Sequence, residues 1–278
     1  FESLQLFMVF PLQTSKSLRN SNGRCHFTLE HTLSLISNLS LTLGGDDAIC
    51  ATVVSFERLS KNPKLDETII SQLLSAFSKI IAGASEKLSQ YDIDRYWTLI
   101  IPLLGRIRSR HLRSEIVSVL AILAEHLNSL ANSLTILQNL NSTLKNSLED
   151  IDYEIRLKAY EKLTINWMLE NSSQNIKAII FQSLFDLRST DFALRQAASK
   201  TIQNFIDVLS THKYRDPCTA IFNDILLPGI KILLNNADKS NRATAIELLG
   251  HLAHSNSEYT PGLNLLYRSD PETNFFIN

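Results

Sequence analysis

The chain has 278 residues, of which 44% are hydrophobic, and this is enough apolar material to bury a continuous core. Its 27 lysines and arginines nearly balance 28 aspartates and glutamates, so global charge indicates neither nucleic-acid binding nor membrane binding. The 8 glycines and 7 prolines are too few for many tight turns or phosphate-binding loops, and they favour helices joined by short links.

The N-terminal segment, residues 1–26, is expected to be partly irregular. Its apolar beginning has no basic region before it and is followed by Pro11, a pattern that does not predict a signal peptide. Residues 13–26 contain serines, asparagines and Gly23 and predict a loop. No stretch of the sequence approaches the roughly 20 apolar residues of a transmembrane helix.

From residue 27 onward, apolar residues recur at the spacing of a packed helix. One stripe runs from Ile69 to Ile81, and Asp66 is placed to cap its N-terminus. Similar stripes predict helices over approximately residues 28–43, 47–60, 87–104, 111–130, 133–148, 152–168, 174–187, 191–209, 218–235, 239–254 and 259–267. The short polar links between them require neighbouring helices to run antiparallel. The chain is therefore expected to be all-α.

The pattern Asp-x-x-x-Arg-x-x-Ala occurs three times in the second half of the chain. Its members are Asp152, Arg156, Ala159, Asp191, Arg195, Ala198, Asp238, Arg242 and Ala245. The arginines are 39 and 47 residues apart, close to the period of about 40–47 residues of HEAT and armadillo repeats. A weaker fourth copy has Arg113, 43 residues before Arg156, but lacks the Asp and carries Ile116 in place of Ala. This period predicts a HEAT/armadillo-type α-solenoid of antiparallel helix pairs.

Each residue type of this pattern suits a stacked array. Asp at a helix start accepts hydrogen bonds from free N–H groups and faces the positive end of the helix dipole. Arg one turn later is placed to bridge to an acidic group of the next repeat, and the small Ala lets two helices approach closely. The alternative is three unrelated ion pairs on solvated helix faces. We expect a single helical-repeat array over residues 1–278, with degenerate repeats at 27–149 and clearer repeats at 150–278. We also expect this array to be an interior fragment of a longer protein.

Motifs of the common catalytic sites are absent from the sequence. It has no Gly-rich phosphate loop, no His-Glu-x-x-His pair, no Cys-x-x-Cys pair and no Gly-x-Ser-x-Gly elbow. Cys25, Cys50 and Cys218 are widely spaced, which favours a reducing compartment over a disulfide framework. His251 and His254 are spaced to share a helix face as metal ligands, but no third ligand follows at suitable spacing. We therefore expect no catalytic, cofactor-binding or metal-binding residues, no small-molecule substrate and no membrane partner.

One short segment has a strong local charge. Arg106, Arg108, Arg110 and Arg113 lie at a turn between two predicted helices, and such a cluster suits contacts with the phosphates of RNA. The alternative is a solvated helix start whose arginines pair with nearby acidic side chains.

Several blocks of the chain resemble one protein family in sequence and in order. They are residues 152–163, 183–188, 191–198, 205–207, 226–230 and 246–250, and the closing Asp270, Glu272, Phe275 and Phe276. They resemble the DRIM (down-regulated in metastasis) family, the very large HEAT-repeat component of the U3 small-subunit processome. The closing block is the most specific, because the other blocks reflect repeat packing. This chain has Asn274 where the family favours an acidic residue, and it lacks the basic helix that follows in the family, so RNA contacts of that helix do not carry over.

The resemblance implies a non-catalytic scaffold of the nucleolus or nucleus that binds pre-ribosomal RNA and processome proteins during 18S rRNA maturation. Two alternatives remain open. A nuclear transport receptor or adaptor-type HEAT solenoid would bind protein partners on its concave face, and recovery of pre-ribosomal RNA by crosslinking separates it from the processome scaffold. A regulatory or kinase-associated helical domain would have its chemistry elsewhere in the full chain, and the complete open reading frame separates that alternative.

Overall fold

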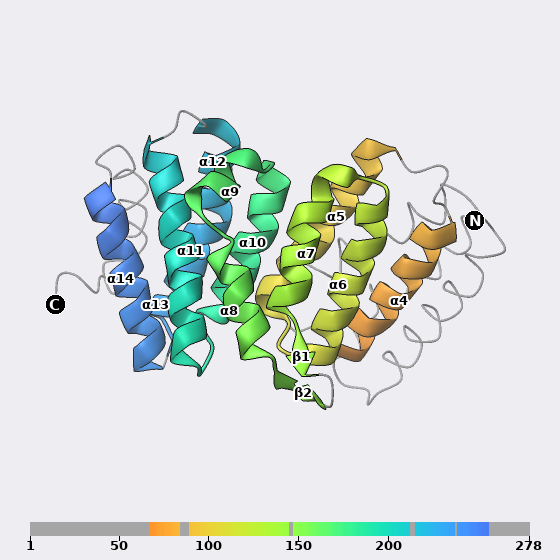
Figure 1. Ribbon diagram of the computed structural model, residues 1–278, viewed down its shortest axis with the longest axis horizontal. Helices are drawn as coiled ribbons and strands as arrows, with labels where there is room; N and C mark the ends of the chain where they lie inside the picture. Colours follow the sequence, from red (N-terminus) through yellow and green to blue (C-terminus); the bar gives the residue numbers. More distant parts are fainter. Residues whose placement is uncertain (1–66, 84–88, 145–146, 212–214, 237, 256–278) are drawn as a thin grey trace, which may run out of the picture. The chain divides into compact units, whose positions relative to one another are not determined.

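The computed structural model describes residues 67–83, 89–144, 147–211, 215–236 and 238–255 (Figure 1). The chain divides into two compact units, Phe1–Leu134 and Thr135–Asn278. Several expectations lie outside the described residues: the irregular segment 1–26, the helices at 28–43, 47–60 and 259–267, the cap at Asp66, and the closing motif with Asp270, Glu272, Phe275 and Phe276. A single continuous array over the whole chain stays a prediction.

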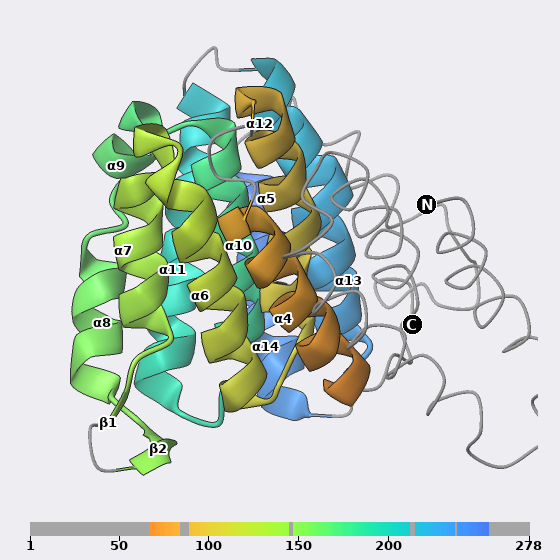
Figure 2. The same cartoon turned by 90° about the vertical axis from the view of Figure 1, so that its right-hand side faces the viewer.

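The first unit is organised around helix α6. Its described helices are α4 (Glu67–Gly83), α5 (Gln90–Arg106) and α6 (Arg110–Glu125), followed by the 3-10 turn η1 (Asn128–Leu130). α6 packs against both α4 and α5, and Figures 1 and 2 show α4 and α6 side by side. In the core, Trp97 is fully buried, and the rings of Phe77 and Tyr96 meet edge to face with their centroids 5.2 Å apart. Amphipathic stripes of apolar side chains thus bury one face of each helix.

The second unit is organised around the long helix α11. Its elements after α7 (Ala131–Leu140) and a short hairpin are α8 (Tyr153–Glu161), α9 (Ile165–Glu170), α10 (Ser173–Asp186), α11 (Phe192–Thr211), α12 (Arg215–Ile221), the π-turn η2 (Phe222–Leu226), α13 (Leu227–Leu234) and α14 (Lys239–Ser255). α11 packs against α8, α9, α10 and α14, and Figure 1 shows α8, α11 and α14 side by side. The prediction of an all-α fold is confirmed.

A β-hairpin stands where the sequence predicts the end of a helix. The helix expected at 133–148 ends at Leu140, and the strands β1 (Thr143–Leu144) and β2 (Ser147–Ile151) pair antiparallel. At the end of α7 the carbonyl of Leu137 accepts from Asn141 twice, from its main-chain N–H at 3.1 Å and from its side-chain amide at 2.8 Å. The apolar residues after Leu140 therefore belong to the hairpin and not to the helix.

Two further boundaries differ from the expected ones. The helix expected at 152–168 is divided into α8 and α9, because Thr164 begins a new helix by accepting from the main-chain N–H of Trp167. The helix expected at 218–235 contains the π-turn η2 just before Pro228. Proline has no N–H to donate and crowds the carbonyl four residues earlier, and one wider turn relieves that conflict.

Polar contacts between neighbouring helices recur at one sequence separation. Two of these hydrogen bonds join residues 41 apart, Asn141 with Gln182 and Asn204 with the carbonyl of Leu163. Three join residues 44 apart, Ser71 with Glu115, Gln203 with Glu247, and Asp207 with His251. These separations are close to the spacing of the arginine pattern, so equivalent helix positions meet once in each repeat.

The three aspartates of the pattern cap the helices that follow them. Asp152 accepts from the main-chain N–H of Ile155 at 3.1 Å and Asp191 accepts from that of Leu194 at 2.8 Å. Asp238 accepts from the main-chain N–H of Ser240 at 2.8 Å. In the weaker copy Ser109 takes this place before α6 and accepts from Leu112 N–H at 3.4 Å. The sequence prediction that these aspartates cap helices is confirmed by these bonds.

The arginines of the pattern tie each helix to the turn before it. Their guanidinium groups donate to main-chain carbonyls: Arg113 to Leu104 (2.5 Å) and Ile107 (3.0 Å), Arg156 to Ser142 (3.0 Å), Arg195 to Ser189 (2.7 Å) and Thr190 (3.1 Å), and Arg242 to Asn236 (2.7 Å). These partners differ from the acidic group of the next repeat that the sequence suggests. Arg195 nevertheless interacts electrostatically with Asp238, the aspartate of the next copy of the pattern. Hydrogen bonds from Ser240 hold the pKa of Asp238 below its usual value, and the charges of Arg195 and Arg242 lower that pKa further.

The small residue of the pattern is buried in each copy. Ala159, Ala198 and Ala245 are at most 1% exposed, and Ile116 takes the same buried place in α6. A side chain as small as alanine at such a buried position allows neighbouring helices to approach closely.

We expect Arg113→Ala to lower the free energy of unfolding by about 2–3 kcal/mol, because it leaves two carbonyls beside a buried side chain without their donor. Arg110→Ala, three residues earlier and exposed, is the matched control and should change it by less than about 0.5 kcal/mol. Urea denaturation followed by circular dichroism measures both. Equal effects of the two substitutions would contradict the anchoring role of Arg113.

We expect Ala198→Leu to destabilise the protein by about 1–3 kcal/mol, because Ala198 is 0% exposed and a larger side chain must displace a packed helix. Ala253→Leu, on the exposed side of α14, is the control and should be neutral within about 0.5 kcal/mol. Thermal melting of both variants is the measurement, and an unchanged melting temperature for Ala198→Leu would exclude a close helix approach there.

Candidate functional site

The turn between α5 and α6 presents three guanidinium groups to solvent. α5 ends at Arg106, Ile107 and Ser109 cap the two helices, and α6 begins at Arg110. The side chains of Arg106, Arg108 and Arg110 are exposed. Within the described part of the chain, Arg108 and Arg110 form no ion pair. The guanidinium groups of Arg108 and Arg110 are therefore available to an anionic partner, and Arg106 adds a third exposed positive charge.

The fourth arginine of this cluster does not belong to the surface. Arg113 is 3% exposed and donates to the carbonyls of Leu104 and Ile107. The prediction that Arg113 contacts RNA is therefore wrong, because its charge is used inside the protein to hold the turn. The anchoring by Arg113 fixes the path of the chain between the two helices, so it positions the three exposed arginines indirectly. The exposed cluster that remains is Arg106, Arg108 and Arg110.

A histidine and a glutamate lie next to the exposed arginines. His111 Nδ1 is 3.4 Å from Glu115 Oε1, and that same oxygen accepts from the hydroxyl of Ser71 on α4. Glu115 is thus held on the side of α6 that faces α4. The turn keeps a local excess of positive charge, which is the charge that a phosphate group near it would meet.

A second polar group lies inside the second unit. The Asp186 carboxylate, 1% exposed, accepts from the Tyr160 hydroxyl at 2.6 Å and from the Gln182 amide at 2.8 Å. Gln182 in turn accepts from the Asn141 amide at 3.0 Å. The group joins the end of α7, α8 and α10, and apart from the partly exposed Asn141 its members are buried, so it serves to hold helices together. The sequence reasoning did not find it, since its members are far apart and fit no motif.

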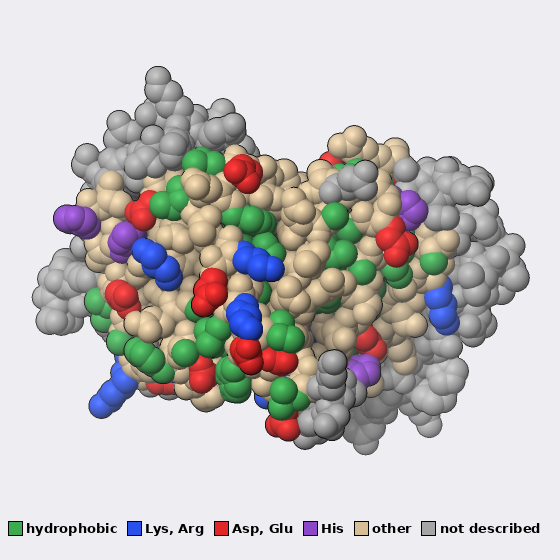
Figure 3. Space-filling view, in the orientation of Figure 1, with side chains coloured by type: hydrophobic (Ala, Val, Ile, Leu, Met, Phe, Trp, Pro, Cys, Tyr) green, Lys and Arg blue, Asp and Glu red, His purple; other side chains and the backbone are tan. Residues whose placement is uncertain are grey.

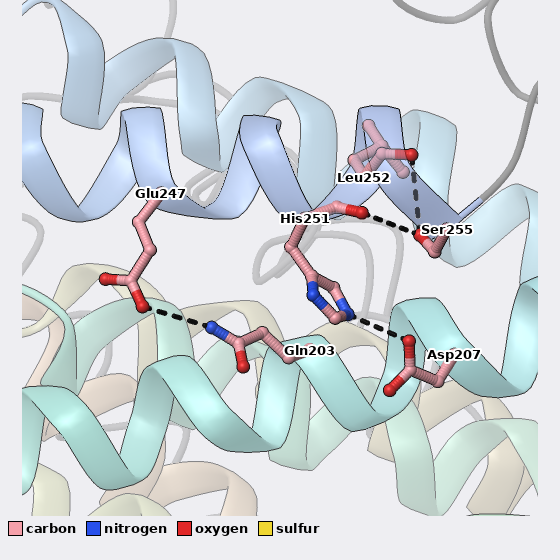
Figure 4. Close-up of polar contacts among 6 residues, drawn as sticks. All are labelled: Gln203, Asp207, Glu247, His251, Leu252 and Ser255. Atoms are coloured by element: carbon pink, nitrogen blue, oxygen red, sulfur yellow. Dashed lines mark hydrogen bonds and ion pairs between the residues drawn. The ribbon is translucent and has the colours of Figure 1, made fainter.

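A row of polar side chains joins α11 to α14 (Figure 4). Gln203 donates to Glu247 at 3.3 Å, and one turn further along both helices the Asp207 carboxylate and His251 Nε2 are 2.8 Å apart. The hydroxyl of Ser255 donates to the main-chain carbonyl of His251 at 2.8 Å. His251 therefore has a carboxylate partner on the neighbouring helix, while His254 is exposed. Among the described residues, no group of three or more His, Cys, Asp or Glu side chains is arranged to hold a metal ion.

The length and apolar character of the described helices decide whether any of them could cross a membrane. None of the helices between residues 67 and 255 combines the length and the apolar character that a membrane span requires. The buried Trp97 and the half-buried Trp167 belong to the helix packing rather than to the arginine turn.

Comparison with known protein families identifies a family that matches most of the chain. The family model described as "U3 small nucleolar RNA-associated protein 20, N-terminal" matches residues 15–259. The match includes every described residue and most of each unit, and it stops before the closing block with Asp270 and Phe276. No curated protein gives a significant match. By the extent of this match, the chain belongs to the family of the N-terminal region of U3 small nucleolar RNA-associated protein 20.

Proposed function

We propose that the chain is a non-catalytic scaffold of ribosome biogenesis. In this role it binds pre-ribosomal RNA and assembly factors of the small-subunit processome during 18S rRNA maturation, in the nucleolus. The observation that carries the proposal is the family match over residues 15–259, because the family is named for its association with the U3 small nucleolar RNA. The narrower assignment to the DRIM family, which rests on the sequence resemblance, is also part of the proposal.

The arrangement of the helices supports a scaffold role. In each unit, helices pack side by side through contacts between equivalent positions, and such arrays offer partners an extended surface rather than one enclosed pocket. Turns between helices are then the natural places for partner contacts, because they can vary while the packed faces stay fixed. A HEAT-repeat architecture fits this packing and the spacing of the arginines.

The exposed turn with Arg106, Arg108 and Arg110 is the part of the described surface that suits RNA best. Guanidinium groups match phosphate geometry and keep their charge at every physiological pH. The chain as a whole has a formal charge of -1, so binding at this turn depends on the local cluster and not on overall attraction. Contacts to phosphates position a protein on RNA without reading its sequence.

Crosslinking in cells, followed by sequencing of the bound RNA, tests the proposed role. Recovery of pre-ribosomal RNA is the expected result. Recovery of protein cargo without ribosomal RNA would favour the alternative of a nuclear transport or adaptor-type solenoid.

We expect the triple substitution Arg106→Gln, Arg108→Gln and Arg110→Gln to weaken RNA binding similarly for all sequences. The slope of log affinity against log salt should fall by about 0.7 for each lost phosphate contact with single-stranded RNA. The measurement is a salt titration of RNA affinity, with melting curves to show that Arg113 still holds the turn.

A matched control removes the same charge elsewhere. Lys162→Gln, Lys200→Gln and Lys239→Gln change three exposed side chains of the second unit and should leave the slope unchanged. An unchanged slope in the arginine variant, with intact folding, would assign the three arginines to a solvated face.

A further inference from the structure

One serine of the arginine turn has a position that no other serine of the chain shares. Ser109 lies between Arg108 and Arg110, and it is the one serine in the sequence with an arginine on each side. Arg106 lies three residues before it. The side chains of these three arginines are exposed, and Ser109 itself is partly exposed. A hydroxyl group at the surface is thus surrounded by three positive charges.

The backbone around Ser109 is extended and lies outside both helices. α5 ends at Arg106 and α6 begins at Arg110. Ile107 has φ -75° and ψ 128°, and Ser109 has φ -58° and ψ 122°. An enzyme that recognises a residue through the side chains on each side of it needs an extended segment, since a helix turns those neighbours away from one another. The turn presents Ser109 and its neighbours in such a conformation.

The hydroxyl of Ser109 has few ties to the rest of the protein. Its oxygen accepts from the main-chain N–H of Leu112 at 3.4 Å, whereas the equivalent bond of Asp191 measures 2.8 Å. Among the described residues, the Ser109 hydroxyl donates to no other group. The hydroxyls of Ser118 and Ser133, by contrast, donate to main-chain carbonyls at 2.9 Å. The Ser109 hydroxyl is therefore available for modification.

The charge around this serine has one sign. Around α8 and α11 of the second unit, basic and acidic side chains lie next to one another (Figure 3), as Lys158 does beside Glu154. Around Ser109, the sequence has no acidic residue between Asp94 and Glu115. Protein kinases choose their substrates by such charge patterns, and a kinase with an acidic substrate groove selects a serine that has arginines beside it.

We propose that Ser109 is a phosphorylation site for an arginine-directed protein kinase, and that its phosphate weakens RNA binding at the arginine turn. In the reaction, the Ser109 hydroxyl oxygen attacks the γ-phosphorus of ATP, and the bond from that phosphorus to the oxygen of the leaving ADP breaks. The hydroxyl proton passes to a base of the kinase. The effect on RNA binding rests on the proposed function, whereas the modification itself does not.

The fold favours a phosphate at this position. Ser109 caps the N-terminus of α6, a helix of 16 residues, and a negative charge there is stabilised by the first N–H groups and by the helix dipole. The phosphate has a charge of about -1.5 to -2, so it balances up to two of the three guanidinium groups at Arg106, Arg108 and Arg110. Guanidinium groups that pair with this phosphate are no longer free to bind the phosphates of RNA.

The first test measures labelling of the full 278-residue chain. The chain is incubated with ATP labelled at its γ-phosphate and with cyclic-AMP-dependent protein kinase, an arginine-directed enzyme, and mass spectrometry locates the label. We expect the label at Ser109. Ser109→Asn removes the hydroxyl but keeps a good helix cap, so it should abolish labelling without unfolding α6. Ser114→Ala is the matched control, because Ser114 also follows an arginine but lies inside α6, and it should be labelled as the wild type is.

The second test compares RNA binding by the phosphorylated and the unmodified chain. In a salt titration with oligouridine, phosphorylation should weaken binding about tenfold and lower the slope of log affinity against log salt by about 0.7–1.4, for one or two lost phosphate contacts. Ser109→Asp adds one negative charge and keeps the cap, so it should have a smaller effect. Ser109→Asn adds no charge and should bind as the unmodified chain does. Melting curves should show no loss of stability on phosphorylation.

Three results would overturn the proposal. Equal labelling of the wild type and Ser109→Asn would mean that another residue is modified. Labelling of Ser109 only after the chain is unfolded by heat would mean that the folded turn is closed to a kinase. The third result is an RNA affinity that phosphorylation of Ser109 leaves unchanged, although the variant with Arg106→Gln, Arg108→Gln and Arg110→Gln binds RNA more weakly. If that variant binds RNA as the wild type does, the proposed function of the turn fails, and labelling of Ser109 is still decided by the first test.

Discussion

The hydrogen bonds from arginine to the main-chain carbonyls of the preceding turn control how each repeat begins. A helix start leaves N–H groups without partners, and the turn before it leaves carbonyls without partners. The aspartate satisfies the first and the arginine satisfies the second, as Asp191 and Arg195 do at the start of α11. Because both residues lie at the beginning of the same helix, they fix the direction of the helix and the path of the preceding loop together. The packing of the following helix depends on that direction.

This arrangement gives a buried or half-buried charge a structural use. A guanidinium group has five N–H donors and keeps its charge, so it can satisfy several carbonyls at once. Arg113 does so almost without contact with solvent, and Ser109 replaces the aspartate in its repeat. The arginine is therefore the more constant member of the motif, since it is present in all four copies and the aspartate in only three. A pattern search that requires the aspartate finds three copies, whereas the hydrogen bonds show the same anchoring in four.

The fold class was predictable from the sequence because apolar periodicity is a property of many residues. Errors at individual boundaries do not remove it, as the division of α8 from α9 at Thr164 shows. The hairpin after Leu140 was not predictable in this way, since Leu144 and Leu148 continue an apolar spacing that also suits a helix. Asn141 follows the end of α7, but Asn139 lies inside the same helix, so the residue type alone does not mark the boundary. Local signals of this kind gain meaning only from their hydrogen bonds.

The candidate surfaces were predictable only in part, for a related reason. Sequence gives the charge of Arg106, Arg108, Arg110 and Arg113 but not their burial, and burial separates the last of them from the rest. Tyr153 and Phe192 have the opposite character, because aromatic residues at helical spacing resemble core residues although both are exposed. Only their position directly after the capping aspartate, at the start of the first turn, gives a signal of exposure.

The reach of Arg156 has a consequence for how the chain can change. Arg195 and Arg242 find their carbonyls six residues back, but Arg156 finds the equivalent carbonyl 14 residues back, at Ser142. The hairpin lies between Ser142 and Arg156, and Arg156 still reaches a carbonyl on the far side of it. Junctions held in this way tolerate added residues, because the anchor closes over the insertion and the helices on either side keep their places. A junction of this kind can therefore carry extra surface while the core stays the same, and the hairpin with Leu144 lies at such a junction.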